Sequence, residues 1–145
     1  MTPTRFVRLN DGWNADPNVP EPSVSLDGEH LVLACAVNAA QFPRFQEGQR
    51  LRLVFSQCWR YRLGGTNDEG WYRGQCRFSG IAPKWGEFYE VEGDLLLARA
   101  PDDWKAGPVE EQQQGSRHFL FYLRDETFEC DALDWQVSLP ATVSP

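Results

Sequence analysis

Residues 50–63, RLRLVFSQCWRYRL, decide the predicted fold, because mainly apolar side chains alternate with mainly polar or charged ones. A period of two over this length indicates a β-strand with one buried and one exposed face. The positions predicted to face inward are the odd ones: Leu51, Leu53, Phe55, Gln57, Trp59, Tyr61 and Leu63. Fourteen residues exceed the usual length of a strand, so we expect a bend or bulge near Ser56 and Gln57.

The residues that follow predict a hairpin and then a third strand. Residues 64–70, GGTNDEG, predict the turn, because Gly and Asn tolerate positive φ angles. Residues 71–78, WYRGQCRF, predict the returning strand, with Tyr72, Cys76 and Phe78 inward. Residues 85–92 predict the third strand of the same sheet.

The remaining segments also favour strands. Residues 30–38 and 117–124 are apolar at both parities, which is typical of central strands that are covered on both faces. In residues 127–138 the apolar parity shifts from even to odd, which predicts a bulge near residues 131–134. The Pro-rich segment 11–29 predicts an irregular crossing that Trp13 fixes to the core.

The chain is therefore predicted to be all-β and to form one domain over residues 1–145. We expect an antiparallel β-sandwich, or a closed or partly open barrel, of about 7–9 strands. The polar loop 101–116 contains the one short helical turn that we expect, over residues 109–114 after Pro108. Residues 139–145 are predicted to form a C-terminal tail.

Charge is unevenly distributed along the chain. The net charge is −7, and the two lysines are outnumbered by twelve arginines. Residues 1–80 have a net charge of +1 and residues 81–145 a net charge of −8. Net acidity disfavours non-specific binding to nucleic acid or to a membrane surface.

We expect a cytoplasmic protein. The N-terminal residues lack the apolar run of a signal peptide, and no stretch approaches the length of a membrane span. The four widely spaced cysteines predict small buried thiols, with disulfide pairing as the alternative.

The predicted hairpin gathers arginines on its outer face. Arg60, Arg62, Arg73 and Arg77 share that face with Trp71 if the register is correct. Like charges on neighbouring strands repel, so this face needs anions. Glu87, Glu90 and Glu92 of the third strand supply them in one interpretation. An anionic ligand or an acidic patch on a partner supplies them in the other.

Aromatic and acidic residues in the same region allow two further interpretations. Rings beside amides and carboxylates suit carbohydrate binding, although such rings are more often core residues. The residues concerned are Asn67, Asp68, Glu69, Trp71, Tyr72, Trp85, Glu87, Tyr89 and Glu90. A glycosidase-type carboxylate pair formed by Glu87 and Glu90 is a less favoured hypothesis, because the spacing does not fix their separation.

The histidines indicate no metal site. His30 and His118 are isolated, without an HxH, HxxxH or CxxC pattern, so we expect no metal and no cofactor. A cysteine nucleophile paired with His118 stays open, although no local signature supports it.

The leading hypothesis is a non-enzymatic, soluble interaction module. It would bind another protein, as an inhibitor, an immunity-type antagonist or an accessory subunit. The binding surface would be the Arg/Trp-rich sheet face or the acidic C-terminal half. The alternative is a β-barrel or sandwich that binds a carbohydrate or a small apolar ligand.

Overall fold

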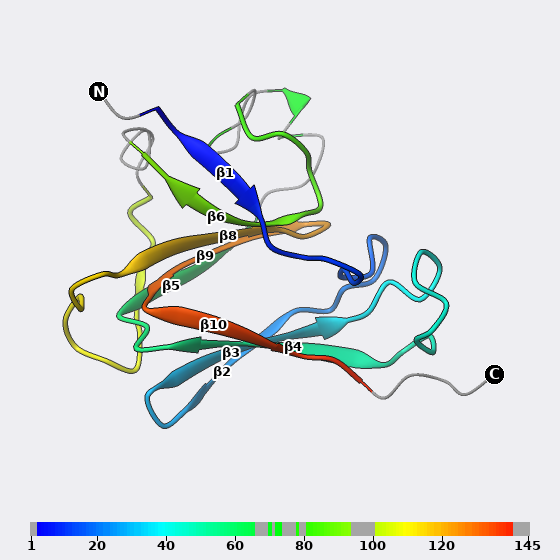
Figure 1. Cartoon of the computed structure of the whole chain (residues 1–145), viewed down its shortest axis with the longest axis horizontal. Helices are drawn as coiled ribbons and strands as arrows, with labels where there is room; N and C mark the ends of the chain where they lie inside the picture. The colour runs from blue at the N-terminus through cyan, green and yellow to red at the C-terminus, as the bar shows by residue number, and fades with distance from the viewer. Residues whose placement is uncertain are drawn as a thin grey trace.

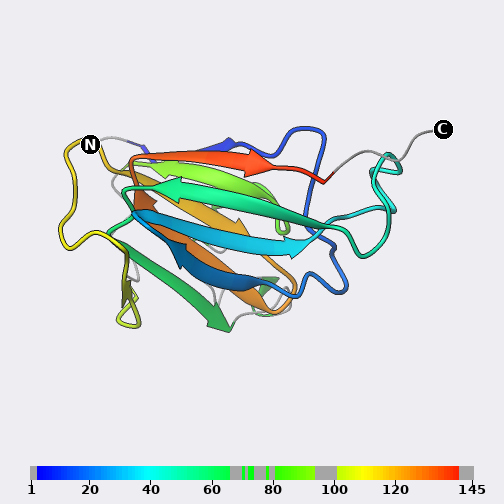
Figure 2. The same ribbon diagram turned by 90° about the horizontal axis from the view of Figure 1, so that it is seen from below.

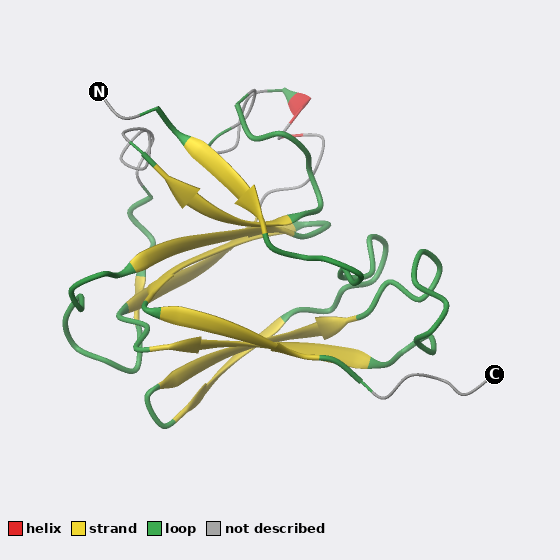
Figure 3. Ribbon diagram, viewed as in Figure 1, coloured by secondary structure: helices red, strands yellow, loops and turns green. Residues whose placement is uncertain are grey.

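A computed structural model shows a sandwich of two antiparallel β-sheets (Figures 1 and 3). It describes residues 3–65, 70, 72, 73, 78, 81–93 and 101–140. The six-stranded sheet has the order β1-β6-β8-β9-β5-β7, and the four-stranded sheet has the order β10-β4-β3-β2. The strands are β1 (Arg5–Arg8), β2 (Ser23–Asp27), β3 (His30–Ala36), β4 (Arg50–Ser56), β5 (Arg60–Gly65), β6 (Phe88–Glu92), β7 (Lys105–Ala106), β8 (Arg117–Tyr122), β9 (Glu126–Ala132) and β10 (Asp134–Ser138).

The deciding stretch crosses from one sheet to the other. β4 belongs to the four-stranded sheet and β5 to the six-stranded sheet, and Gln57 between them has a φ of 53°. The predicted bend is therefore confirmed, and it is the point at which the chain changes sheet. The break places Cys58 in the buried core, whereas Trp59 is only half-buried. The prediction that Trp59 faces the core is wrong, because alternation does not continue through the bend.

A second crossing pairs with the first. β9 and β10 are separated by Leu133, which shifts the apolar positions from even to odd numbers, as the sequence predicted. β9 pairs with β5, and β10 pairs with β4. At the bend itself, Trp59 N donates to Asp131 O at 3.1 Å and Leu133 N donates to Ser56 O at 2.9 Å. The two chain segments thus bend together while they stay hydrogen-bonded.

The main core lies between the sheets. Leu51, Leu53 and Phe55 of β4 are completely buried there, as their alternation predicted. Phe55 contacts the rings of Phe88, Phe119 and Phe128 from the opposite sheet, with centroid separations of 6.1, 5.3 and 5.5 Å.

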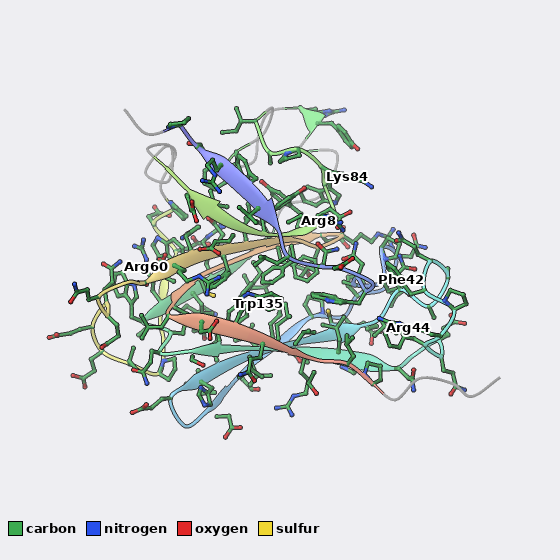
Figure 4. All side chains as sticks on the ribbon, in the orientation of Figure 1. Arg8, Phe42, Arg44, Arg60, Lys84 and Trp135 are labelled. Carbon is green, nitrogen blue, oxygen red and sulfur yellow. The ribbon has the colours of Figure 1, made fainter. Side chains whose placement is uncertain are left out.

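Two further predictions about the core are confirmed. Trp13, on the irregular crossing, is 3% exposed and fixes that segment to the core. β3 and β8 are interior strands of their sheets. Trp135 lies between the sheets (Figure 4), with its ring 5.2 Å from that of Phe88.

A second apolar cluster covers part of the outer face of the six-stranded sheet. Its buried members are Phe78, Ala82, Tyr89, Val91, Leu120 and Tyr122, with Phe6 and Trp85 packed against them. Burial raises the pKa of Tyr89 to about 12, with Glu87 adding to the effect. This part of the outer face is therefore apolar and covered, and polar groups can occupy the rest of it.

The predicted hairpin between residues 50–63 and 71–78 is wrong. The partners of β5 are β9 and β7. Gly70 and Tyr72 are helical, and Tyr72, predicted to face inward, is 74% exposed. Phe78 is buried as predicted, whereas Cys76 lies outside the described residues.

Two smaller predictions differ from the structure. The strand predicted over residues 85–92 exists as β6, but it pairs with β1 and β8. The helical turn predicted over residues 109–114 is absent from that described segment, which consists of bends and turns. Sequence alternation detects strands, but their partners depend on which apolar faces the whole chain brings together.

The ring cluster around Phe55 predicts a large loss of stability on truncation. Phe55→Ala is expected to lower the free energy of unfolding by about 3–5 kcal/mol, since it removes the contacts between the sheets and leaves a cavity. Phe55→Leu, which keeps most of the apolar volume, is expected to cost less. Urea unfolding of both variants would measure this. Equal losses would show that Phe55 is not closely packed.

Candidate functional site

Charged side chains gather on the outer face of the six-stranded sheet, beside the second apolar cluster. Strand register explains the arrangement. In one cross-strand row Arg60 of β5 lies opposite Asp131 of β9, which lies opposite His118 of β8. In the next row Arg62 lies opposite Glu129. We call these residues, together with Asp103, the charged cluster.

His118 is held by two carboxylates. Its Nδ1 lies 2.8 Å from Asp131 Oδ1, and its Nε2 lies 2.8 Å from Glu129 Oε1. The side chain of His118 is 5% exposed and that of Glu129 is fully buried. Burial alone would lower the pKa of His118, but the hydrogen bonds and charges of Asp131 and Glu129 outweigh it and raise the pKa. Both ring nitrogens then donate to carboxylates.

The two arginines complete the neutralisation. Arg62 Nη1 donates to Glu129 Oε2 at 3.1 Å, and its Nε and Nη2 donate to the two carboxylate oxygens of Asp103 at 2.7 and 3.2 Å. Arg60 Nε donates to Asp131 Oδ2 at 2.5 Å. With His118 protonated, three cations face three carboxylates, so the charged cluster is neutral in itself.

The segment around β7 covers the charged cluster. The Trp104 ring lies 6.1 Å from the His118 ring, and the Arg60 guanidinium lies 4.2 Å from the Trp104 ring centroid. The Arg60 guanidinium also lies 4.7 Å from the Trp59 ring. Gly107 permits the close approach of this segment, because a Cβ at that position would collide with the backbone carbonyl of Cys58. Arg60 thus contacts two tryptophan rings.

A cleft of about 690 Å³ borders the charged cluster. Its lining consists of Arg60, Glu90, Val91, Glu92, Gly93, Gln112, Ser116, Arg117, His118 and Asp131. Arg117 binds Glu90 through two hydrogen bonds of 2.7 and 3.0 Å and also contacts Asp134. The Ser116 hydroxyl is buried and has no hydrogen-bond partner in the described part of the chain. We call this the Arg60 cleft.

A second cleft, of about 510 Å³, is lined by amides, charged groups and rings. Its residues include Asn14, Asn18, Asn38, Gln41, Lys84, Trp85 and Glu87. In Figure 4, Lys84 and Arg60 lie at opposite ends of the six-stranded sheet. This cleft is therefore separate from the Arg60 cleft. We call the second one the Trp85 cleft.

The structure gives Arg60 and Arg62 different partners from those that the sequence suggested. Glu87, Glu90 and Glu92 were candidates to neutralise them, but β6 is not a neighbour of β5. Instead, Glu90 binds Arg117. Glu92 lies 3.9 Å from Arg5, and Glu87 contacts Asn10 and Lys84.

The residues proposed for carbohydrate binding are divided between several places. Tyr89 belongs to the second apolar cluster and is 2% exposed. The Trp85 ring stacks on that of Tyr122 at 4.8 Å and also lines the Trp85 cleft. Glu87 lines the Trp85 cleft and Glu90 lines the Arg60 cleft. The two carboxylates therefore do not flank one common space.

Several predicted residues lie outside the described part of the chain. These are Asn67, Asp68, Glu69, Trp71 and Arg77. Arg73 is described as an exposed turn residue. Arg73 therefore does not lie on a returning strand beside Arg60 and Arg62, as the sequence predicted.

Sequence reasoning missed the acidic residues of the charged cluster and the tryptophan that packs over the cluster. Asp103, Trp104, Glu129 and Asp131 were not singled out. A signal for two of them was present, because Glu129 and Asp131 alternate with Phe128 and Cys130 in one strand. Two carboxylates on the second face of a buried strand require cations on the neighbouring strands.

The cysteines are buried thiols where the structure describes them. Cys35, Cys58 and Cys130 are free, and burial raises the pKa of Cys35 to about 12. His118 has carboxylates at both ring nitrogens, so neither nitrogen is positioned to activate one of these thiols.

The described residues contain neither a metal-binding cluster nor a membrane-spanning helix. Within that part of the chain, no group of three or more His, Cys, Asp or Glu side chains is arranged to hold a metal ion. The helical residues there form no segment that is long and apolar enough to cross a membrane.

The buried imidazolium predicts that stability falls as the pH rises. Folding raises the pKa of His118 above its ordinary value of 6.5. The protonated ring therefore makes its full contribution to the free energy of unfolding at pH values below 6.5. This contribution is lost as the pH rises through the folded-state pKa. Within the part of the chain that the structure describes, the charged groups that face the ring are Glu129 and Asp131, with Arg60 and Arg62 behind them.

The measurement is urea unfolding at several pH values between about 6 and 9. The free energy of unfolding of the wild-type protein is expected to fall over this range. His118→Gln is expected to be less stable at pH 6 and to show a much smaller fall. The same pH dependence in both proteins would contradict the assignment of a protonated His118.

Comparison with protein-family models, curated proteins and solved structures finds no match for this chain. The two clefts and the charged cluster must therefore be interpreted from their own chemistry.

Proposed function

We propose that the protein is a non-enzymatic binding module that recognises another protein through Arg60 and the rim of the Arg60 cleft. The observation that carries this proposal is the state of the Arg60 side chain. Its Nε donates to Asp131, and its guanidinium lies 4.7 Å from the Trp59 ring and 4.2 Å from the Trp104 ring. Its Nη1 and Nη2 have no hydrogen-bond partner among the described residues, and the residue lines the cleft.

This arrangement suits a binding hot spot. Trp and Arg are enriched among the residues that contribute most to protein–protein binding. An arginine that is already fixed loses little rotamer freedom when it binds a partner. The entropic cost of ordering its side chain in the complex is therefore small. The acceptor for its terminal nitrogens would be a carboxylate or a backbone carbonyl oxygen of the partner.

The geometry favours this surface over the acidic side chains of β6 and β9 in the C-terminal half. The acidic side chains Glu90, Glu129 and Asp131 in that half are already paired with arginines or His118. A carboxylate that is neutralised inside the fold has little charge to offer a partner. The Arg60 nitrogens, in contrast, keep hydrogen-bonding capacity.

The positions of the possible catalytic groups favour binding over hydrolysis. Glu87 and Glu90 line different clefts, and the carboxylates of the charged cluster accept hydrogen bonds from cations. A pair for acid–base chemistry would need one carboxyl group with a raised pKa. The pKa of Asp131 is instead lowered, since the hydrogen bonds from His118 and Arg60 outweigh its burial.

Arg60→Lys tests the proposal. The lysine keeps a positive charge beside Asp131 but lacks the guanidinium that contacts the rings of Trp59 and Trp104. Charge reversal is a poorer test, because a carboxylate beside Asp131 would destabilise the fold. A partner captured from native lysate and then purified is expected to bind Arg60→Lys at least about 30-fold more weakly, a loss of about 2 kcal/mol. Calorimetry or interferometry would measure the dissociation constant.

Arg52→Lys is the matched control. Arg52 is an exposed arginine of β4, in the other sheet, and the same change there is expected to leave the affinity unaltered. Trp104→Ala should weaken binding as Arg60→Lys does. Equal affinity of the wild-type, Arg60→Lys and Trp104→Ala proteins for every captured partner would refute the proposal.

The Trp85 cleft favours carbohydrate binding as a second candidate function. Its lining of Asn, Gln and charged side chains around a tryptophan can supply hydrogen bonds to hydroxyl groups. Its volume of about 510 Å³ is in the range of small-molecule sites. The sequence had indicated Trp85 and Glu87 for this role, and both line the cleft.

Gln41→Ala tests the second candidate. A glycan that binds in the Trp85 cleft is expected to change tryptophan fluorescence, and Gln41→Ala should weaken that binding because it removes an amide from the lining. Gln112→Ala removes the same type of side chain from the Arg60 cleft and serves as the control. No fluorescence response across a glycan panel, or an equal effect of both variants, would count against a sugar site there.

A further inference from the structure

β2 forms an open edge of the four-stranded sheet. Among the described strands its one hydrogen-bonded neighbour is β3. Its five residues, SVSLD, form a regular ladder and include neither proline nor lysine, two of the residues that commonly protect sheet edges. Leu26 within it is 57% exposed. In Figure 2, β2 is the blue strand at the edge of the front sheet.

The register shows which backbone groups face outward. Asp27 pairs with His30 across the two-residue turn formed by Gly28 and Glu29, so these two residues exchange hydrogen bonds. Bonding alternates along an antiparallel pair. The N–H and C=O groups of Val24 and Leu26 therefore point away from β3.

The hydrogen bonds of β3 agree with this alternation. Ala36, at an even position, donates to Pro20 O on the β2 side. Val37, at an odd position, donates to Gln49 O on the β4 side. The backbone groups of even-numbered residues of β3 therefore hydrogen-bond to the segment that contains β2. The odd-numbered residues of β3, which lie opposite Val24 and Leu26, hydrogen-bond to β4 instead.

We propose that β2 receives an extended segment of another protein, which adds to the sheet as an antiparallel fifth strand. Residues of that segment opposite Val24 and Leu26 would each exchange a pair of backbone hydrogen bonds with them. This surface lies on the other sheet from the Arg60 cleft, so the inference goes beyond the proposed function and does not depend on it.

Charge at the two ends of β2 defines the chemistry of the segment. At one end of its outer face stands Asp27. At the other end, the Arg50 guanidinium is held beside Ser23: its Nη2 donates to Glu21 O at 2.8 Å and to Ala34 O at 3.2 Å and lies 3.4 Å from Ser23 Oγ. The positive charge at this end favours an acidic residue opposite Ser23, and Asp27 favours a basic residue opposite itself, four positions earlier in an antiparallel segment.

The inner face of β2 calls for apolar residues in between. Val24 is packed against the main core, and Leu26 on the same face is exposed. In Figure 2, β5 lies beyond the β2 edge, and its inward residues Tyr61 and Leu63 are only partly buried. The segment thus has the pattern basic–apolar–polar–apolar–acidic.

A labelled synthetic peptide tests the proposal. The probe is fluorescein-labelled Ser-Thr-Lys-Val-Ser-Val-Glu-Thr-Ser, and the control peptide exchanges its Lys and Glu. Fluorescence anisotropy is expected to give a dissociation constant on the order of 100 µM for the probe, since one short added strand buries less than a standard interface. The control peptide is expected to bind at least about fivefold more weakly, because its charges repel Asp27 and Arg50.

Variants of the protein provide the matching tests. Leu26→Lys should weaken binding, whereas Val7→Lys, at an exposed apolar position of β1 in the other sheet, should not. The double variant Asp27→Lys with Arg50→Glu should reverse the preference between the two peptides. Arg60→Lys should bind the probe normally, which separates this inference from the proposed function.

Amide hydrogen exchange of the wild-type protein gives a readout that needs no variant. The amides of Val24 and Leu26 are expected to become protected when the probe is added. Three results would overturn the proposal: no binding up to about 1 mM, well above the dissociation constant expected for such a short strand, equal affinity for both peptides, or protection of these amides by self-association without peptide.

Discussion

The paired crossing between the two sheets is the constraint on which the rest of the structure depends. At Gln57–Trp59 and at Leu133 two antiparallel segments leave one sheet and enter the other while the hydrogen bonds between residues 56 and 133 and between 59 and 131 continue the ladder. Because the segments bend together, neither sheet can shift its register without disturbing the other. The crossing therefore fixes which residues of β5 and β9 lie opposite one another, and through them the composition of both faces.

The charged cluster depends on that register. A slip of β5 by one residue would turn Arg60 and Arg62 toward the apolar core. A slip by two residues would leave either Glu129 or Asp131 without its arginine. A fully buried Glu129 is tolerable only with its cationic partners, because an unpaired buried charge is strongly destabilising. The charges thus add little net stability as pairs, but they penalise the alternative registers of the sheet.

Alternation along the chain predicted much of the fold and little of the site. β3, β4, β8 and the shift between β9 and β10 were evident, because each carries its own pattern of apolar residues. Strand partners were not evident, since β5 meets β9 across more than sixty residues of sequence and no local pattern encodes that meeting. For this reason Arg60 and Arg62 were recognised as needing anions, but their acidic partners were sought on β6. Trp104 carried no signal in a polar loop, because its role depends on Gly107 and the backbone of Cys58.

The pairing that makes the charged cluster a structural element also prepares Arg60 for the contact role that we propose. An arginine that had to attract its own counterion would be mobile and hydrated, and binding would first have to remove that water. Arg60 instead has its Nε bonded to Asp131 and its guanidinium beside two indole rings, so its terminal nitrogens would be the groups that a partner contacts. In the proposed function, the pairing inside the sheet would hold in place the same side chain that recognises the partner.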